Sequence, residues 1–480
     1  MDPEAFRRAG HELIDWIADH RGGVESRPVR RPVEPGSVAA ALPAEPPTVV
    51  EDVEALLADL DRIVVPAITD VQHPMFYGWF PSNAGLASVL GDLASSGIGA
   101  LGISWESAPA LTEVEQVVCD WMRQLTGLSD AWSGSINDTA STSCLVAMLL
   151  ARERAGDYAQ TRGGLSELPA PLLVYSTGEA HSSVRKAALL AGFGADHLRI
   201  VPIDPVTRAM DPGAFRAMVA DDLAGGARPA AVVASSGTTG TTAFDPLAEV
   251  VEVASRHGIW VHVDAAMAGS ALILPEERHR FDGIEGADSL CWNPHKWLGS
   301  VLDTSLFYVR DTEHLVRVMS SNPSYLRSRA DGEVVQYRDW GLPLGRRFRA
   351  LKLWFLLRLD GVEAIQARLR RDLVNAAWLA DQVEAADDWT LVAPCTLQTV
   401  CVRHQPDGLD DEELDAHTVR WAAELNDSGR AYVTPSLLDG SWMVRVSIGA
   451  ERTEAGHVER LWAAMQETVG VDLLAGDRHG

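Results

Sequence analysis

The stretch Trp260-Val-His-Val-Asp264 is a short apolar run that ends in a carboxylate, and runs of this kind decide the fold. Leu172-Leu-Val-Tyr175 and Ala230-Ala-Val-Val-Ala234 have the same character, and serine follows each of them. Helical patterns from Ser141 to Arg154 and from Pro246 to His257 alternate with such runs. Short strands that alternate with helices predict a mostly parallel sheet with helices on both faces. Ligands bind such sheets beyond the carboxyl ends of the strands, where the polar residues of this chain are expected.

The length of 480 residues predicts two or three domains. We expect a helical N-terminal segment over residues 1–85, a large domain with the parallel sheet over 86–360, and a small α+β domain over 361–480. Asp2-Pro3 predicts the start of a first helix, and Gly22-Gly23 predicts its end. A proline-rich stretch follows, so this helix is suited to packing on something distant, such as another subunit.

The composition excludes several classes of partner. The formal charge is −26 and the pI is near 4.9, so we expect neither nucleic acid nor an anionic membrane as partner. The five cysteines have no metal-binding or disulfide spacing, and we expect reduced thiols and no metal site. The sequence has no apolar stretch of membrane-spanning length and does not open like a signal peptide. We therefore expect a cytoplasmic protein.

Lysine is rare in this chain, at only three of the 41 basic residues. Lys296 lies in Asn293-Pro-His-Lys-Trp297 after a strand-like stretch, whereas Lys186 and Lys352 lie in helical patterns. A lysine can lose its proton and form a Schiff base, which arginine cannot do. Together with Asp264 it suits pyridoxal 5′-phosphate (PLP), whose aldehyde needs an amine and whose ring nitrogen needs a carboxylate. The alternatives are a surface lysine and a carboxylate that only caps a helix.

Further polar groups follow other predicted strands. His181 could stack on the cofactor ring and handle a proton near neutral pH, although a lone histidine is more often structural. The phosphate could bind at Asp138-Thr-Ala-Ser-Thr-Ser143 before a helix, at the turn Ser236-Gly-Thr-Thr-Gly240, or at His295. A non-catalytic nucleotide-binding protein is the alternative of another class, but the turn lacks the lysine of a Walker loop.

Four motifs taken together closely resemble the group II PLP-dependent decarboxylases, and within them the aromatic-L-amino-acid decarboxylases. These motifs are Ala180-His-Ser-Ser-Val184, Val263-Asp-Ala-Ala266, Asn293-Pro-His-Lys-Trp297 and Pro343-Leu-Gly-Arg-Arg-Phe-Arg349. The likeness covers nearly the whole chain. It implies PLP fold type I with a mostly parallel, seven-stranded sheet, PLP as the cofactor, and a homodimer whose N-terminal helices are exchanged between subunits.

The resemblance also implies roles for individual residues. The catalytic set would be Lys296 as the Schiff-base lysine, Asp264 on the pyridine nitrogen, His181 stacked on the ring, and Tyr325 as the proton donor to the α-carbon. Other residues would contact the cofactor: Ala266 on the opposite face of the ring, Thr239 near its oxygen, and Ala140, Ser141, Asn293 and His295 at the phosphate. Tyr325 lies in a long polar stretch that matches the mobile catalytic loop of the family.

By the same resemblance, a pocket for the substrate's ring would be formed by Trp79, Phe80, Pro81, Ser82, Leu101, Ile103 and Gly345, with Leu101 and Ile103 from the partner subunit. The segments Phe76–Ser82 and Leu101–Ile103 are apolar and contain no arginine or lysine, so an aromatic side chain suits them better than the carboxylate of glutamate. The alternative is that these aromatic residues belong only to the core. Trp79 and Ile103 differ from the Tyr and Phe that are common in animal relatives, whereas Gly345 leaves room for an indole.

We therefore expect PLP-dependent decarboxylation of aromatic L-amino acids, of the tryptophan, phenylalanine, tyrosine or dopa type, to arylalkylamines and CO2. The runner-up is an aromatic aldehyde synthase, which uses the same cofactor but consumes oxygen and releases ammonia. Relatives of that kind usually replace the loop tyrosine or the stacking histidine, and this chain keeps both Tyr325 and His181.

Overall fold

A computed structural model describes residues 1–321 and 330–476 of the chain, which divides into two compact units. Unit 1 consists of residues 1–81 and 371–392 together with the chain from residue 398 onward. Unit 2 consists of residues 82–370 and 393–397. The predicted boundaries of three domains stay predictions.

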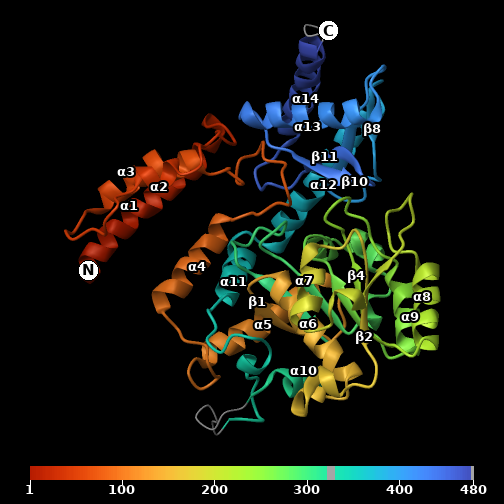
Figure 1. Ribbon diagram of the computed structural model, residues 1–480. Coiled ribbons are helices and arrows are strands. Elements are labelled where there is room, and N and C mark those ends of the chain that lie inside the picture. The colour runs from red at the N-terminus through yellow and green to blue at the C-terminus, as the bar shows by residue number, and fades with distance from the viewer. Residues whose placement is uncertain (322–329, 477–480) are drawn as a thin grey trace. The chain divides into compact units, whose positions relative to one another are not determined.

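Unit 2 is built on a seven-stranded sheet in the order β1-β7-β6-β5-β4-β2-β3. Figure 1 labels β1, β2 and β4 of this sheet, with helices around them. The strands are β1 (Ser133–Asn137), β2 (Leu172–Thr177), β3 (Leu198–Val201), β4 (Arg228–Ser235), β5 (Trp260–Asp264), β6 (Ser289–Trp292) and β7 (Ser305–Val309). β7 runs antiparallel to β1 and β6, and the other neighbouring pairs are parallel. The predicted mostly parallel, seven-stranded sheet is therefore confirmed.

Four helices of unit 2, α6 to α9, connect strands of the sheet, and the others precede β1 or follow β7. The helices of this unit are α4 (Leu86–Ile98), α5 (Pro109–Thr126), α6 (Ala140–Ala155), α7 (Ser182–Leu190), α8 (Pro212–Ala224), α9 (Leu247–Arg256), α10 (Thr312–Met319) and α11 (Ala350–Leu359). α6 lies across the sheet and contacts β1, β4, β5, β6 and β7. One buried stripe of α6 consists of small residues at helical spacing, Ala140, Cys144, Ala147 and Ala151, and larger buried residues such as Met148 and Leu150 flank it.

The connections bring the predicted site residues to one edge of the sheet. β1, β2, β4, β5 and β6 all run in the same direction, so their carboxyl ends lie along a single edge. The start of α6 follows β1, His181 follows β2, and the turn with Thr239 follows β4. Asp264 ends β5, and Lys296 follows β6. This edge is where parallel sheets bind their ligands.

Unit 1 combines both ends of the chain. Its N-terminal part holds α1 (Pro3–Gly22), α2 (Ser37–Ala41) and α3 (Val53–Asp59). Its C-terminal part holds an antiparallel sheet in the order β10-β11-β9-β8, together with helices. These elements are α12 (Val362–Glu384, which begins in unit 2), β8 (Trp389–Leu391), β9 (Thr399–His404), α13 (Asp411–Asp427), β10 (Thr434–Leu438), β11 (Ser441–Ser447) and α14 (Ala455–Gly476).

The first helix begins and ends as its sequence predicts. The Asp2 carboxylate accepts a hydrogen bond of 2.8 Å from the Ala5 N–H and so caps the exposed donors of the first turn. Pro3 is the first residue of the helix, and Gly23 is its C-cap. Among the described residues, no helix of this chain is both long and apolar enough to cross a membrane.

Candidate active site

The segment that carries Lys296 is tied to the end of the neighbouring strand β5. The Asn293 N–H donates to the Ala266 carbonyl at 2.9 Å, and the Lys296 N–H donates to the Asn293 carbonyl at 2.9 Å. The Lys296 side chain is half-buried between two buried residues, His295 and Trp297. Lys296 therefore lies at the ligand-binding edge of the sheet. Its surroundings differ from those of a surface lysine, which was the alternative. Lys186 on α7, by contrast, is exposed.

Asp264 is a buried carboxylate, with 7% of its surface exposed at the end of β5. Its Oδ1 accepts a 3.0 Å hydrogen bond from the Ala266 N–H, which resembles a local turn and not the cap of a long helix. A buried carboxylate is costly unless a cation or hydrogen bonds compensate it. Asp264 is therefore suited to pair with a cationic group that enters the site.

His181 lies near both of these charged residues. Partial desolvation of its ring lowers the pKa of His181; the Asp264 carboxylate opposes this shift and the Lys296 ammonium adds to it. The ring Nδ1 of His181 accepts a 3.2 Å hydrogen bond from the Ser183 N–H at the start of α7. The neutral ring therefore carries its proton on Nε2. The structure thus brings together the three residues for which the sequence predicted the chemistry.

The predicted phosphate contacts fit an anionic group. α6 begins at Ala140 without a side-chain cap, so the N–H groups of its first turn point out at the positive end of a 16-residue helix. The Asn293 side chain is buried, and its Nδ2 amide is the group that can donate to an anion, since its Oδ1 can only accept. His295 Nδ1 accepts the Thr304 N–H at 2.9 Å, so Nε2 carries the proton of the neutral ring. These groups offer N–H donors, which a phosphate requires.

The buried carboxylate of Asp245 holds the turn after β4 in place. This residue was not identified from the sequence. Asp245 accepts 2.7 Å hydrogen bonds from the N–H groups of Met210 and Ser235. Burial raises the pKa of Asp245 to about 6. Thr239 is half-buried in this turn. The turn thereby carries Thr239 to the same edge of the sheet as the lysine.

The predicted ring-pocket residues are divided between the two units. Trp79, Phe80 and Pro81 belong to unit 1, where Trp79 has a positive φ of 44° and its N–H donates to Thr434 Oγ1 at 2.7 Å. A bulky residue with positive φ is uncommon and marks a strained, often functional, position. The guanidinium of Arg445 lies 5.0 Å above the Phe80 ring and donates to the Trp79 carbonyl at 3.2 Å. Arg445 lies on β11, far from Trp79 in the sequence, so the fold alone brings the two together.

Ser82, Leu101, Ile103 and Gly345 belong to unit 2. Gly102 and Arg346 exchange two backbone hydrogen bonds of 3.2 Å, which brings Leu101 and Gly345 together within one chain. A Cβ added at Gly345 would lie 3.8 Å from Leu101 Cδ1, an ordinary contact. Position 345 is therefore open enough to take a small side chain, and glycine there leaves space beside Leu101. Tyr325 lies outside the described residues.

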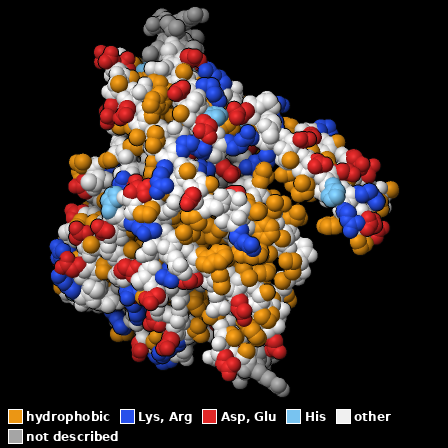
Figure 2. Space-filling view, turned by 180° about the vertical axis from the view of Figure 1, so that it is seen from behind, with side chains coloured by type: hydrophobic (Ala, Val, Ile, Leu, Met, Phe, Trp, Pro, Cys, Tyr) orange, Lys and Arg blue, Asp and Glu red, His pale blue; other side chains and the backbone are white. Residues whose placement is uncertain are grey.

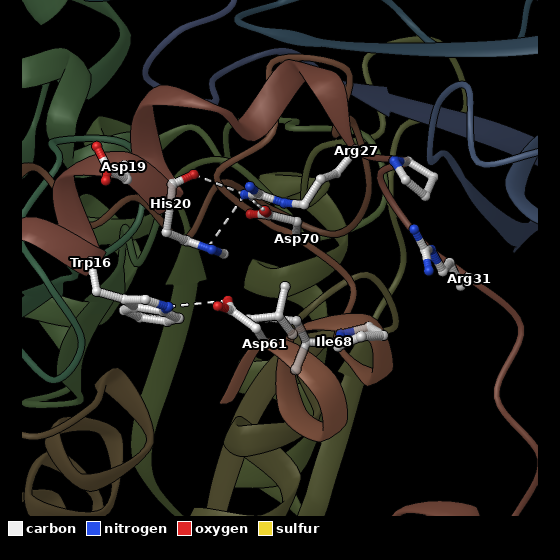
Figure 3. Close-up of a pocket in the computed structure, with 11 residues that line it drawn as sticks. Trp16, Asp19, His20, Arg27, Arg31, Asp61, Ile68 and Asp70 are labelled. Carbon is white, nitrogen blue, oxygen red and sulfur yellow. Dashed lines mark hydrogen bonds and ion pairs between the residues drawn. The ribbon is translucent and has the colours of Figure 1, made fainter. Parts of the chain in front are cut away.

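A cavity of about 440 Å³ lies in the N-terminal part of unit 1 (Figure 3). Several of its polar groups pair with one another. The Trp16 Nε1–H donates to Asp61 at 3.0 Å, and Arg27 donates to the His20 carbonyl at 2.9 Å and lies 3.4 Å from Asp70. The cavity contains none of the predicted site residues. Its paired charges indicate a structural role and not a ligand-binding one.

Comparison with known proteins agrees with this geometry. Residues 35–405 match the pyridoxal-dependent decarboxylase conserved domain. The chain is 36% identical to the aromatic-L-amino-acid decarboxylase of Catharanthus roseus, over 99% of this chain and 95% of the relative. It is also 36% identical to the phenylacetaldehyde synthase of Arabidopsis thaliana, over 97% of this chain and 96% of that protein.

The fold is likewise similar to that of solved structures. The crystal structure of Oryza sativa TDC with PLP and tryptamine superposes with a TM-score of 0.95 at 34% identity, and 98% of each chain is covered. The predicted carboxy-lyase and its predicted cofactor are thereby confirmed. The chain belongs to the pyridoxal-dependent decarboxylase family, and it is a carboxy-lyase of PLP fold type I that uses pyridoxal 5′-phosphate.

Proposed function

We propose that the enzyme decarboxylates aromatic L-amino acids to arylalkylamines and CO2. The observation that carries this proposal is the grouping of Lys296, Asp264 and His181 at the ligand-binding edge of the sheet. The near full-length likeness to an aromatic-L-amino-acid decarboxylase supports an aromatic substrate. The apolar residues of the predicted ring pocket support it as well, since a flat ring prefers such surroundings.

The chain's own residues prepare the site for this reaction. When bound, PLP supplies an aldehyde for the amine and an electron-poor ring that accepts the electron pair released by the departing CO2. Lys296 would hold the cofactor through its Nζ and give it up to the substrate's amine. Asp264 would keep the ring nitrogen protonated, because a buried carboxylate beside it favours the charged form. The first turn of α6, Asn293 and His295 would hold the phosphate.

The remaining roles concern the ring face and a proton. His181 would stack on one face of the ring, with Ala266 against the other and Thr239 near the ring oxygen. Tyr325 would donate a proton to the α-carbon once CO2 has left. In unit 2, Ser82 and Gly345 would contact the ring of the substrate, with Leu101 and Ile103 supplied by the partner subunit.

We also propose that the enzyme acts in the cytoplasm as a homodimer. All five cysteines are free thiols, as suits a reducing compartment. α4 leaves Leu86, Leu90 and Leu93 between 42% and 47% exposed, and Figure 2 shows hydrophobic side chains gathered on this face. Exposed hydrophobic side chains that gather on one helix face suit a contact with a second copy of the chain.

Product analysis tests the substrate class. The holoenzyme is incubated with tryptophan, 5-hydroxytryptophan, tyrosine, dopa, phenylalanine and glutamate, and the amine, aldehyde, CO2 and hydrogen peroxide are measured. Amine and CO2 in equal amounts from one or more aromatic substrates, with none from glutamate, are the expected result. Turnover of glutamate alone would contradict the proposal.

The second candidate is an aromatic aldehyde synthase, which the likeness to phenylacetaldehyde synthase favours. That reaction converts the amino acid, O2 and water to aldehyde, CO2, ammonia and hydrogen peroxide. We predict that Tyr325→Phe removes the proton donor, so that oxygen intercepts the electron-rich α-carbon and the product shifts from amine to aldehyde with peroxide. Amine alone at an unchanged rate from Tyr325→Phe would make His181 or a water the better donor.

A further inference from the structure

A row of buried polar side chains on β5 and β6 leads to Asp264. Trp260, His262 and Asp264 alternate along β5 and share one face of the strand. In the parallel register with β6, His262 pairs with Ser289, and Asp264 pairs with Cys291. His262, Ser289 and Cys291 are fully buried. Polar groups in such a place need partners, and the register places these groups beside one another.

The contacts of this row are compatible with hydrogen bonds that all run toward Asp264. The Trp260 Nε1–H donates to Ser289 Oγ at 2.8 Å, and Ser289 Oγ lies 2.9 Å from His262 Nδ1. The serine hydroxyl can accept from Trp260 and donate to Nδ1, and in this tautomer the neutral imidazole carries its proton on Nε2. That Nε2 lies 3.6 Å from Cys291 Sγ, and the Cys291 thiol in turn lies 3.8 Å from Asp264 Oδ1 as a donor.

The two middle groups keep the protonation states that this direction requires. Burial lowers the pKa of His262 to about 4, so the ring is neutral near neutral pH. Burial and the Asp264 carboxylate raise the pKa of Cys291 well above its usual range, so the thiol keeps its proton. Asp264 is thus the one charge in the row, and the last donor before it is the thiol.

The two oxygens of Asp264 are used differently. Oδ1 takes the Ala266 N–H at 3.0 Å and the Cys291 thiol at 3.8 Å. No protein hydrogen bond reaches Oδ2 within the described ranges 1–321 and 330–476. A carboxylate that is held through one oxygen presents the other in a fixed direction. This arrangement leaves Oδ2 for a cation from outside the protein.

We propose that Cys291, supported by His262, Ser289 and Trp260, is a positioning residue that fixes Asp264 through Oδ1 and so directs Oδ2 to the ring nitrogen of PLP. The inference rests on the proposed role of Asp264. It goes beyond that role because it attributes the orientation of the carboxylate to a thiol that would not contact the cofactor. Residues that orient a ligand-binding group from behind typically tune it as much as its direct partners do.

The test uses the purified holoenzyme and three substitutions. Cys291→Ala removes the donor, Cys291→Ser restores an O–H donor, and Cys144→Ala is the matched control. Cys144 is also a buried thiol near Asp264, but no hydrogen bond joins the two in the described structure. The readouts are the visible absorption band of the bound cofactor, the pH dependence of that band, and the dissociation constant of PLP from the apoenzyme. Cys291→Val, which fills the site with a slightly larger side chain that has no donor, takes the place of Cys291→Ala if the alanine variant does not fold.

We expect Cys291→Ala to shift the absorption band of the bound cofactor. We also expect it to raise the dissociation constant of PLP about three- to tenfold, the range of one ordinary hydrogen bond. Cys291→Ser should return both toward the wild-type values, and Cys144→Ala should leave both unchanged. In an Asp264→Asn background, Cys291→Ala should change the dissociation constant less than about twofold, because the two residues act as one unit.

Two results would overturn the inference alone. One is the same band and dissociation constant in Cys291→Ala and Cys144→Ala. The other is an effect of Cys291→Ala that is as large in Asp264→Asn as in the wild type. If Asp264→Asn by itself leaves the band and the affinity for PLP unchanged, the proposed role of Asp264 fails, and the inference fails with it.

Discussion

At the scale of single residues, the three lysines differ in their surroundings, and this difference yields a prediction. Lys296 is half-buried at the site, Lys186 is exposed on α7, and Lys352 is buried 3.3 Å from Asp303 and 3.4 Å from Asp92. We predict that Lys296→Ala abolishes the adduct that borohydride traps between PLP and the chain, and that Lys186→Ala keeps it. Peptide mapping of the reduced protein checks this, and label on Lys186 or Lys352 would refute the assignment. Lys352→Ala is a poor control, since it would leave two carboxylates without their partner.

Two buried histidines predict how stability depends on pH. Burial lowers the pKa of His262 and of His295 from 6.5 to about 4. As pH falls from 6.5 toward 4, the unfolded chain takes up protons that the folded chain does not, so the free energy of unfolding decreases. The loss is at most about 1.4 kcal/mol per pH unit for each histidine. Denaturant titrations of the apoenzyme across this window measure the slope, which His262→Gln should reduce and the exposed control His257→Gln should not. An equal slope in all three proteins would show that these rings do not control it.

At the scale of elements, one buried ion pair joins α5, β1 and the segment around Gly345. Arg346 donates to both oxygens of Glu115 at 2.9 and 2.6 Å, and Glu115 also accepts the Ile136 N–H at 2.8 Å. Removal of one partner leaves an uncompensated buried charge, which typically costs about 3–5 kcal/mol. We therefore expect Glu115→Ala to lower the free energy of unfolding by that amount, as measured by denaturant titration. The exposed control Glu424→Ala on α13 should change it by less than about 0.5 kcal/mol. A loss below about 1 kcal/mol for Glu115→Ala would show that the pair does not hold these elements together.

At the scale of the whole molecule, the exposed leucines of α4 predict the assembly state. α4 packs closely on α11, since a Cβ at Gly91 would lie 2.4 Å from the Leu351 carbonyl oxygen, and its outer leucines stay uncovered. Burial of a leucine side chain contributes about 1.5–3 kcal/mol, so a charge at Leu90 or Leu93 should weaken a dimer strongly. We expect sedimentation to show monomers for Leu90→Glu and Leu93→Glu, and dimers for the wild type. Leu223→Glu on α8, which lies away from α4 (Figure 1), is the control and should stay dimeric. A wild-type monomer would contradict the proposal.

The sequence by itself determined the class of the fold and the main chemical groups. The strand–helix alternation follows from local patterns of apolar residues, and β2, β4, β5, α6 and α9 lie where these patterns place them. The same topology brings Asp264, His181 and Lys296 to one edge, because each follows the carboxyl end of a parallel strand. A rare lysine and a carboxylate at a strand end were visible in the printed sequence, and so was the first helix with its Asp2 cap.

Only the tertiary structure decided which residues meet across the chain. Cys291 reaches Asp264 from 27 positions away, Arg346 reaches Glu115 from 231, and Arg445 reaches Trp79 from 366. These contacts depend on strand register and on the packing of elements, and no local pattern of residues specifies either. A shift of one residue between β5 and β6 would turn the Cys291 side chain to the other face of the sheet and away from Asp264. The carboxylate could thus be recognised from its place in the sequence, whereas the thiol behind it could be recognised only once the sheet had formed.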